Sequence, residues 1–328
     1  MDKPKPRVTI VGLGLIGGSI GLALRQAEVT SAVVGHDKDR GASNQAKKLG
    51  AVDRAEWNLV SACEESDLVI LATPVGAIED TLKAIGPYLR PGCVVIDTAT
   101  LKAPVLAWAA EILPDTVHFV GGDPVVGPAS SGQGGLQAAR PDLFQKSLFC
   151  LVPAPRAEEA AVKLVTDLVR ILGAQPLFFD AAEHDGLMAA VEHLPAILAL
   201  ALLEMAISQP TWRELRKMAG PSFGASTHLT SADPAAYGDL YAANRDNVLR
   251  WMDAFSASWV SIRQALAENQ VEELPKRFER AAQERNKWLH DRAQGLWADG
   301  LQAELPDKPN LLDTFLGSYW RKDRRKGK

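Results

Sequence analysis

Three glycines near the amino terminus are spaced for binding a phosphate group. The apolar run Val8–Val11 leads directly into Gly12-x-Gly14-x-x-Gly17, and a helix-like run follows over Leu15–Gln26. In such a turn one glycine makes the tight bend, one lets a pyrophosphate approach, and one lets the helix pack on the strand. Free amides and the dipole at the helix N-terminus favour the phosphate charge. The pattern predicts a dinucleotide site formed by Gly12, Leu13, Gly14, Leu15, Ile16 and Gly17.

An acidic residue after the next strand-like run indicates which dinucleotide would bind. Ala32–Gly35 is typical of a second strand, and Asp37 follows it, about 20 residues beyond the last glycine of the turn. A carboxylate there accepts hydrogen bonds from the ribose hydroxyls and repels a 2′-phosphate, so the sequence favours NAD. Lys38 and Arg40 lie close enough in the chain to keep NADP open as the alternative.

Two further loops follow predicted strands and carry polar side chains. Thr73-Pro74-Val75 follows the run Leu68–Leu71, and a small, proline-stiffened loop can lie along a dinucleotide. Thr100 and Lys102 follow the run Cys93–Ile96 and would supply a hydroxyl and a cation near the nicotinamide. Ligands of open parallel sheets bind beyond the carboxyl ends of the strands, so we expect both loops near the glycine turn. A plain strand-to-helix turn is the alternative for each loop.

The elements that must position these residues alternate between strand and helix through the first half of the chain. Strands are predicted at Val8–Val11, Ala32–Gly35, Leu68–Leu71, Cys93–Ile96, His118–Val120 and Leu148–Val152, and helices at Leu15–Gln26, Ala77–Tyr88, Lys102–Leu113 and Glu158–Leu172. This alternation implies right-handed βαβ units and an α/β, Rossmann-type, doubly wound and mostly parallel sheet.

The second half of the chain is predicted to be all-helical. Helical stretches are expected at His184–Ile207, Pro234–Ala243, Asp246–Ala267 and Val271–Asp291. The predicted domains are 1–179 for the dinucleotide, 180–300 for substrate binding and dimerisation, and 301–328 as an extension with a basic tail. Apolar residues recur at helical spacing between Leu194 and Met205, a stripe that belongs to the core and in part to a partner subunit.

Composition limits the classes of protein to which this chain can belong. With 328 residues, 47% of them hydrophobic and 23% charged, the chain is typical of a globular protein of two domains. The net charge of −4 gives no basic field for nucleic acid or a membrane surface. We find no signal peptide, no apolar run approaching a membrane span and no metal-ligand spacing. Of the three widely spaced cysteines (Cys63, Cys93 and Cys150), the last two lie in apolar, strand-like runs, which favours buried thiols. The expected compartment is the cytoplasm.

Three motifs together resemble the prephenate/arogenate dehydrogenases, the enzymes of tyrosine biosynthesis. The first is the glycine turn, and the second is the segment Phe119–Gly127, with Leu143-Phe144 following it. The third runs from Glu183 to Pro195 and includes Glu192-His193-Leu194-Pro195. The resemblance extends from about Val8 to about Arg263. The first motif is shared with many dehydrogenases, whereas the other two are far more specific.

The resemblance implies a Rossmann domain followed by a helical domain that dimerises, with the active site between them. The family removes a hydride from the ring carbinol of prephenate or arogenate and releases the ring carboxylate as carbon dioxide, driven by rearomatisation. The protein must supply an acceptor for the hydroxyl proton, a group that orients the substrate, and cations for the carboxylates of a small-molecule substrate.

This chain departs from the family pattern where that chemistry would occur. The second motif usually has a histidine directly before its proline, and here that position is Asp123. An ordinary aspartate, with a pKa of about 3.9, is a weak base near neutrality. The third motif usually reads Ser-His-Leu-Pro-His, and only its central histidine remains, as His193. A Thr-Arg pair usually clamps a substrate carboxylate; His228 stands at the arginine position, and Arg245 is a candidate replacement.

Three hypotheses about function follow. In the first, an NAD(P)-dependent oxidoreductase of this family, Thr100 orients the substrate and Asp123 or His193 accepts the proton. A substrate carboxylate is then bound by Lys102, His228 or Arg245. The second is a β-hydroxyacid type of dehydrogenase, whose lysine and asparagine we do not find around His184–His193. The third is a catalytically inactive NAD-binding regulatory protein with an altered substrate pocket.

Overall fold

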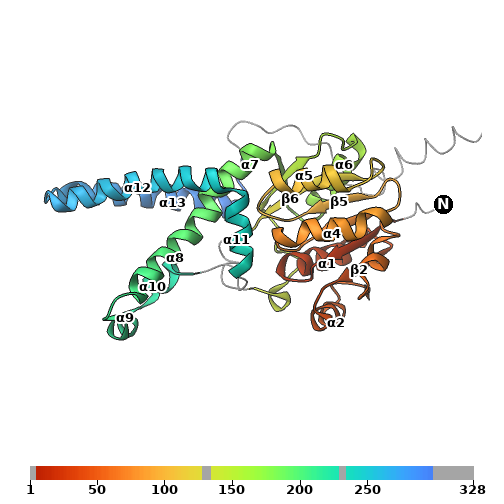
Figure 1. Ribbon diagram of the computed structural model, residues 1–328, viewed down its shortest axis with the longest axis horizontal. Coiled ribbons are helices and arrows are strands. Elements are labelled where there is room, and N and C mark those ends of the chain that lie inside the picture. The colour runs from red at the N-terminus through yellow and green to blue at the C-terminus, as the bar shows by residue number, and fades with distance from the viewer. Residues whose placement is uncertain (1–4, 128–133, 229–233, 298–328) are drawn as a thin grey trace, which may run out of the picture. The chain divides into compact units, whose positions relative to one another are not determined.

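The computed structural model describes residues 5–127, 134–228 and 234–297. The chain divides into two compact units, which are described separately below (Figure 1). The sheet unit contains Met1–Ala181 and Arg292–Lys328, and the helical unit contains Ala182–Asp291. The extension with the basic tail predicted at 301–328 lies wholly outside the described residues.

The sheet unit is built on one eight-stranded sheet in the order β3-β2-β1-β4-β5-β6-β7-β8. The strands are β1 Arg7–Val11, β2 Ala32–His36, β3 Arg54–Ala55, β4 Leu68–Leu71, β5 Val94–Asp97, β6 His118–Val125, β7 Leu148–Pro153 and β8 Gln175–Phe178. All neighbouring pairs are parallel except β6 with β7. The strand order reverses between β1 and β4, which is where doubly wound sheets bind dinucleotides. The predicted Rossmann-type sheet is confirmed.

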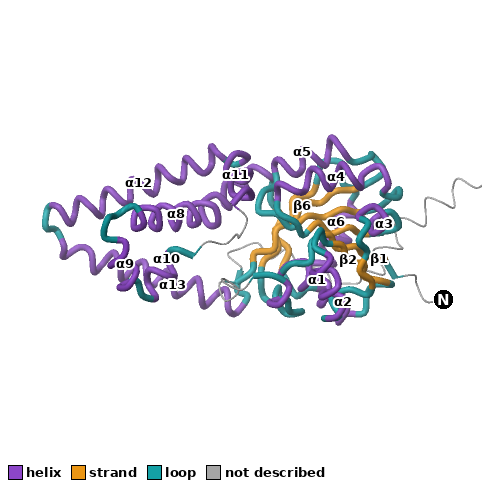
Figure 2. Tube along the Cα trace, turned by 60° about the horizontal axis from the view of Figure 1, so that its bottom comes forward, coloured by secondary structure: helices purple, strands orange, loops and turns teal. Residues whose placement is uncertain are grey.

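Helices cover both faces of this sheet (Figure 2). They are α1 Leu15–Ala27, α2 Arg40–Lys48, α3 Leu59–Cys63, α4 Ile78–Ile85, α5 Ala103–Ile112 and α6 Glu159–Ile171. Helix α1 packs against α6, while α4 packs against α3 and α5. Because both faces are covered, the central strands are continuous apolar runs, and β4 (Leu-Val-Ile-Leu) is completely buried. Cys63, Cys93 and Cys150 are buried, as the sequence indicates for the last two.

The described part of the helical unit contains no strand. Its elements are α7 Ala181–Met188, a π-helical segment Ala189–His193, α8 Leu194–Ile207, α9 Trp212–Met218, α10 Pro221–Ser226, α11 Pro234–Ala243, α12 Arg245–Ala267 and α13 Leu274–Gln294. Large apolar side chains remain exposed on these helices in the single chain, among them Val191, Met218, Trp259, Val260 and Phe278. A unit that exposes so much apolar surface is expected to bury part of it against another chain.

The run from Ala181 to Ile207 requires a correction to the sequence analysis. These 27 residues form one continuous helical run, and an 18-residue window within it has a mean hydropathy of 1.9, long and apolar enough to cross a membrane. The expectation that no apolar run approaches such a length is therefore wrong. The sequence suggested otherwise because Glu192 and His193 interrupt the run. A single helix of this kind is weak support for a membrane span, since core helices have the same composition.

Candidate active site

The glycine turn at the end of β1 brings three backbone segments together. Gly12 has a φ of 92°, and a Cβ there would overlap the carbonyl oxygen of Ala72 after β4. A Cβ on Gly17 would overlap the carbonyl oxygen of Gly12, so α1 can lie this close to the turn only with glycine. These two glycines are therefore required by the fold itself.

Gly14 differs from them, because a Cβ added to it would meet no atom within 4 Å. It is the N-cap residue of α1, no side chain caps the helix there, and the first turn holds no acidic residue. Leu13 is buried, and the half-buried Leu15 and Ile16 pack against the core. The backbone amides at this end of α1 thus border open space, the arrangement that binds a phosphate.

Asp37 is held beside the glycine turn by backbone hydrogen bonds. The amide of Leu13 donates to its Oδ2 (2.8 Å), and the amide of Asp39 donates to its Oδ1 (2.9 Å). The first bond links the end of β2 to the turn after β1. Lys38 is exposed, and the guanidinium of Arg40 lies over the ring of Trp57, 5.0 Å from its centroid. The Asp37 carboxylate is thus held beside the glycine turn, and its binding of the ribose of NAD stays a prediction.

Asp37→Asn is expected to reduce the preference for NAD over NADP by about tenfold or more, because it removes the charge that repels a 2′-phosphate. The exposed Lys38 and Arg40 then attract that phosphate. Dissociation constants for both dinucleotides, measured by calorimetry, check this result. The control is Asp39→Asn, which removes a neighbouring charge while asparagine preserves the N-cap of α2. An unchanged NAD/NADP ratio in Asp37→Asn would remove Asp37 from the cofactor site.

The loop after β4 contains an unsatisfied hydroxyl next to this turn. Thr73 Oγ1 is buried and has no hydrogen-bond partner among the described residues. Its Cγ2 lies 3.1 Å from the point where a Cβ of Gly12 would be. Pro74 is exposed, and Val75 is buried at the start of a 3-10 turn, Val75–Ala77. An unsatisfied hydroxyl, an open glycine and an uncapped helix N-terminus together fit a bound dinucleotide.

The structure gives Lys102 a different role from the expected one. Its side chain is completely buried and forms an ion pair with Asp97, whose side chain is also completely buried. The Lys102 ammonium also donates to the carbonyl oxygen of Gly122 (2.7 Å). Asp97 in turn accepts from the amides of Ala99 (3.0 Å) and Gly122 (3.1 Å). An ammonium with these partners and no exposed surface holds the loop rather than a substrate carboxylate.

The same interactions position the two candidate residues of this region. Gly122, which precedes Asp123 in β6, is held through both its amide and its carbonyl group. Asp123 lies within the strand, opposite Cys150 of β7, and is 3% exposed. Thr100, between Asp97 and Lys102, is half-buried. The Asp97–Lys102 pair therefore links the loop that carries Thr100 to the strand that carries Asp123.

The end of β6 is held by a residue that the sequence did not indicate. Arg292 Nη2 donates to the carbonyl oxygens of Val125 and Val126, each at 2.6 Å. Its guanidinium also lies over the ring of Trp297, and burial lowers the pKa of Arg292. Arg292 lies more than 160 residues from this strand in the sequence, so no local pattern could have revealed the contact.

In the helical unit, His193 is completely buried at the end of the π-helical segment Ala189–His193. Pro195, in the first turn of α8, has no amide hydrogen and its ring crowds the preceding turn. The wider π-turn accommodates this, with the amide of Leu194 donating to Ala189. Burial lowers the pKa of His193 to about 4; Asp185 raises it in part, and His184 lowers it further.

His193 also has neighbours on α11 and at the start of α12. Asn244 Nδ2 lies 3.2 Å from His193 Nδ1, and the Tyr241 hydroxyl donates to the His193 carbonyl oxygen (3.1 Å). Burial raises the pKa of Tyr241 to about 12. Arg245, which follows Asn244, is exposed, and so is His228 beyond α10. No described contact joins His228 to His193.

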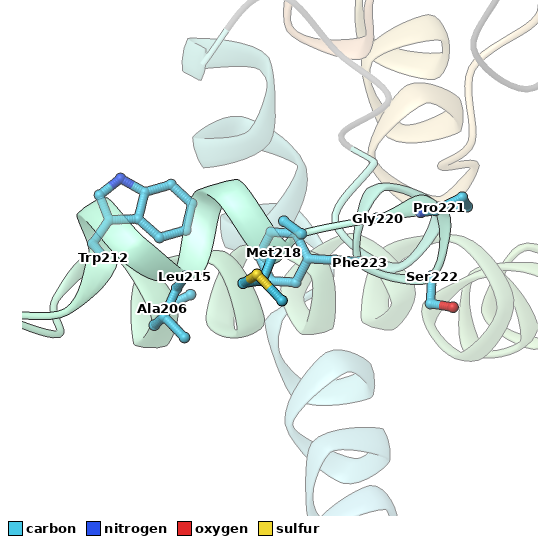
Figure 3. A pocket seen from close by; sticks show the side chains of 9 residues that line it. Ala206, Trp212, Leu215, Met218, Gly220, Pro221, Ser222 and Phe223 are labelled. Atoms are coloured by element: carbon cyan, nitrogen blue, oxygen red, sulfur yellow. The ribbon is translucent and has the colours of Figure 1, made fainter.

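An apolar pocket of about 440 Å³ lies elsewhere in the helical unit (Figure 3). It is lined by Ala206 of α8 and by residues of α9 and α10, including Trp212, Met218 and Phe223. None of the predicted site residues lines this pocket, and it holds no charged side chain. No cluster of His, Cys, Asp and Glu within the described ranges could hold a metal ion.

Two family models match adjacent parts of the chain. Residues 20–177 match the nucleotide-binding domain of prephenate dehydrogenase, and residues 180–280 match the dimerization domain of prephenate dehydrogenase. The two matched regions meet close to the boundary between the sheet unit and the helical unit.

Characterised relatives match over most of the chain. The prephenate dehydrogenase of Bacillus subtilis is 28% identical over 96% of this chain and 85% of its own length. That of Lactococcus lactis is 30% identical over 76% of this chain and 68% of its own length. The cyclohexadienyl dehydrogenase of Zymomonas mobilis is 26% identical over 85% of this chain and 94% of its own length.

Solved structures of prephenate and arogenate dehydrogenases have the same fold as this chain. The prephenate dehydrogenase of Aquifex aeolicus, in complex with hydroxyphenyl propionate and NAD⁺, is 25% identical to this chain, with a TM-score of 0.77. The match covers 88% of this chain and 99% of that one. The arogenate dehydrogenase of Synechocystis has the same fold, with a TM-score of 0.68.

Proposed function

Because the chain belongs to the prephenate dehydrogenase family, we propose that it is an NAD-dependent dehydrogenase that oxidatively decarboxylates a cyclohexadienyl carboxylate of the prephenate/arogenate type. The observation that carries the proposal is the complete dinucleotide cradle: the open Gly14, the unsatisfied Thr73 hydroxyl and the oriented Asp37 carboxylate. When bound there, NAD would accept the hydride from the substrate.

Two residues of the sheet unit supply the group that orients the substrate and the group that accepts its proton. The Thr100 hydroxyl orients the substrate, and the Asp123 carboxylate accepts the proton of the reacting hydroxyl. Asp97 and Lys102 hold the backbone on both sides of these residues. Among the residues of the helical unit, the exposed Arg245 is our candidate for binding a substrate carboxylate, with His228 as the alternative.

We further propose that the protein is a homodimer formed through its helical unit and that it acts in the cytoplasm. The match of residues 180–280 to a dimerization domain and the exposed apolar side chains of the helical unit support the dimer. Sedimentation at micromolar concentration tests it: a monomer of 35.3 kDa would contradict the proposal, and a species of twice that mass would support it.

The role of Asp123 provides a direct test of the proposed reaction. Asp123→Asn keeps the size of the side chain but removes its basicity. We therefore expect kcat to fall by about 10²- to 10⁴-fold, while the dissociation constant of NAD is unchanged. Steady-state reduction of NAD by prephenate and by arogenate is the measurement. If Asp123→Asn retained full turnover, the proton acceptor would have to be another group.

The family assignment disfavours the two other functions. A β-hydroxyacid dehydrogenase is not supported by either family model that the chain matches. A regulatory protein without catalysis would bind NAD, as shown by a shift in the melting temperature, but would turn over neither cyclohexadienyl substrate.

A further inference from the structure

The hydrogen-bond partners of His193 limit the chemistry that its imidazole can perform. The ring is completely buried and packs edge-to-face on Tyr241, with 6.4 Å between the ring centroids. Nδ1 faces the side-chain amide nitrogen of Asn244 at 3.2 Å. Nε2 is buried and has no hydrogen-bond partner among the described residues. Which ring nitrogen carries the proton therefore depends on Asn244.

The orientation of the Asn244 amide is fixed by a backbone carbonyl group. Its Nδ2 donates to the carbonyl oxygen of Asp185 (2.8 Å), and a backbone carbonyl can only accept. Its Oδ1 accepts from the Nδ2 of Asn247 (2.8 Å). Exchanging the oxygen and nitrogen of Asn244 would place two acceptors against each other at Asp185. The second hydrogen of Asn244 Nδ2 therefore points to His193 Nδ1.

We propose that Asn244 is a positioning residue that holds His193 in the tautomer protonated at Nε2, so that His193 is a hydrogen-bond donor and not a base. An imidazole nitrogen that receives a hydrogen bond carries no proton, so the proton of the neutral ring is on Nε2. Under the function proposed above, on which this part rests, Nε2–H would donate to an oxygen of the cyclohexadienyl carboxylate. Of the two proton acceptors considered from the sequence, Asp123 then remains.

The charged groups around the ring are consistent with a neutral imidazole. Asp185 on α7 favours the protonated ring, whereas burial and the neighbouring His184 disfavour it, and together they lower the pKa of His193 to about 4. His184 and Asp185 bond to each other through Nδ1 and Oδ1 at 2.9 Å. Tyr241 of α11, whose pKa is raised to about 12, faces the His193 ring. Glu192 directly precedes His193 in the chain.

Nitrogen-15 NMR of the intact protein tests the tautomer without any substrate. The chain has six histidines, and a His193→Gln variant identifies the signals of this one. We expect Nδ1 to have the shift of an unprotonated nitrogen and Nε2 that of a protonated one, with no titration between pH 8 and about 5. Protonation at Nδ1, or titration near pH 6.5, would overturn the proposal whether or not the protein is a dehydrogenase.

Variants of the two asparagines separate the role of Asn244 from a general effect on the fold. Asn244→Asp replaces the donor by a carboxylate that accepts from Nδ1–H, so the proton should appear on Nδ1 and the pKa of His193 should rise. Asn247→Ala removes one bond to Asn244 but leaves the donation to Asp185, so the tautomer should not change. A shift of the proton in Asn247→Ala, or none in Asn244→Asp, would contradict the proposal.

Turnover of two His193 variants adds a kinetic test. Glutamine can place an amide donor near the position of Nε2 but cannot act as a base, whereas alanine supplies neither group. We expect His193→Gln to retain kcat/KM within about tenfold of the parent, and His193→Ala to lose about 10²-fold. Equal losses of about 10²- to 10⁴-fold in both variants would instead identify His193 as a base.

Discussion

Lys102→Met is expected to lower the free energy of unfolding by about 3–5 kcal/mol, because it leaves a buried carboxylate without its cation. Lys102 and Asp97 are both completely buried, and the ammonium is also the donor to Gly122. Methionine fills the space of the aliphatic chain, so little of the loss comes from packing. Urea unfolding, followed by circular dichroism, measures the change.

Two further variants make this prediction specific to the buried pair. The double variant Asp97→Asn/Lys102→Met removes both charges and should lose clearly less stability than Lys102→Met alone. Lys83→Met removes an ammonium of the exposed Lys83–Glu79 pair on α4, and it should leave the midpoint of unfolding essentially unchanged. A loss in Lys102→Met as small as that in Lys83→Met would show that the buried pair does not stabilise the loop.

Gly14→Ala is expected to weaken NAD binding by about tenfold or more without lowering the melting temperature. A Cβ on Gly14 meets no protein atom within 4 Å, and its φ of −81° is allowed for alanine, so the fold can accept the change. The added methyl group instead occupies the space through which a pyrophosphate approaches the backbone. Calorimetric titration with NAD and a thermal melt of the same sample give both quantities.

Gly12→Ala is the matched control in the same turn. Its φ of 92° strains any residue with a Cβ, and that Cβ would overlap the carbonyl oxygen of Ala72. We expect a loss of about 2 kcal/mol or more in the free energy of unfolding. If Gly14→Ala bound NAD as tightly as the parent chain, the glycine turn would not be the phosphate site.

Sequence patterns predicted the sheet unit well because its signals are local. The runs at β1, β2 and β4 are mostly apolar, as strands buried on both faces must be. Asp37 was found because the spacing between the glycine turn and the acidic residue is fixed by the βαβ unit. The short elements β3, β8 and α3, and α9 and α10 of the helical unit, were missed, since two to seven residues carry too little periodicity. The nine-residue helix α2 was also missed.

The contacts of the site were harder to predict because they join distant parts of the chain. Lys102 was expected to bind a substrate. In the structure it is buried and donates to Gly122 of β6, a contact that no local pattern indicates because the two residues lie 20 positions apart. His193 was identified from its motif, whereas Asn244, 51 residues further along, was not. A buried ion pair and a buried asparagine resemble their exposed counterparts in sequence, and only the packing around them distinguishes the two.

Relative to the family pattern, Asp123 and His228 stand where a histidine and an arginine are usual, whereas the glycine turn and Asp37 keep the pattern of a dinucleotide site. In our proposals, Asn244 keeps His193 a neutral donor, and Arg245 supplies the positive charge that the arginine of the Thr-Arg pair would otherwise give.

The central claim is that this chain couples hydride transfer to NAD with decarboxylation of a cyclohexadienyl substrate. The most direct measurement incubates the purified protein with NAD and either prephenate or arogenate. Reduced nicotinamide and carbon dioxide are then followed in the same sample. We predict that both products form in a one-to-one ratio with at least one of the two substrates. Binding of NAD, seen as a rise in melting temperature, with neither product formed from either substrate, would contradict the account.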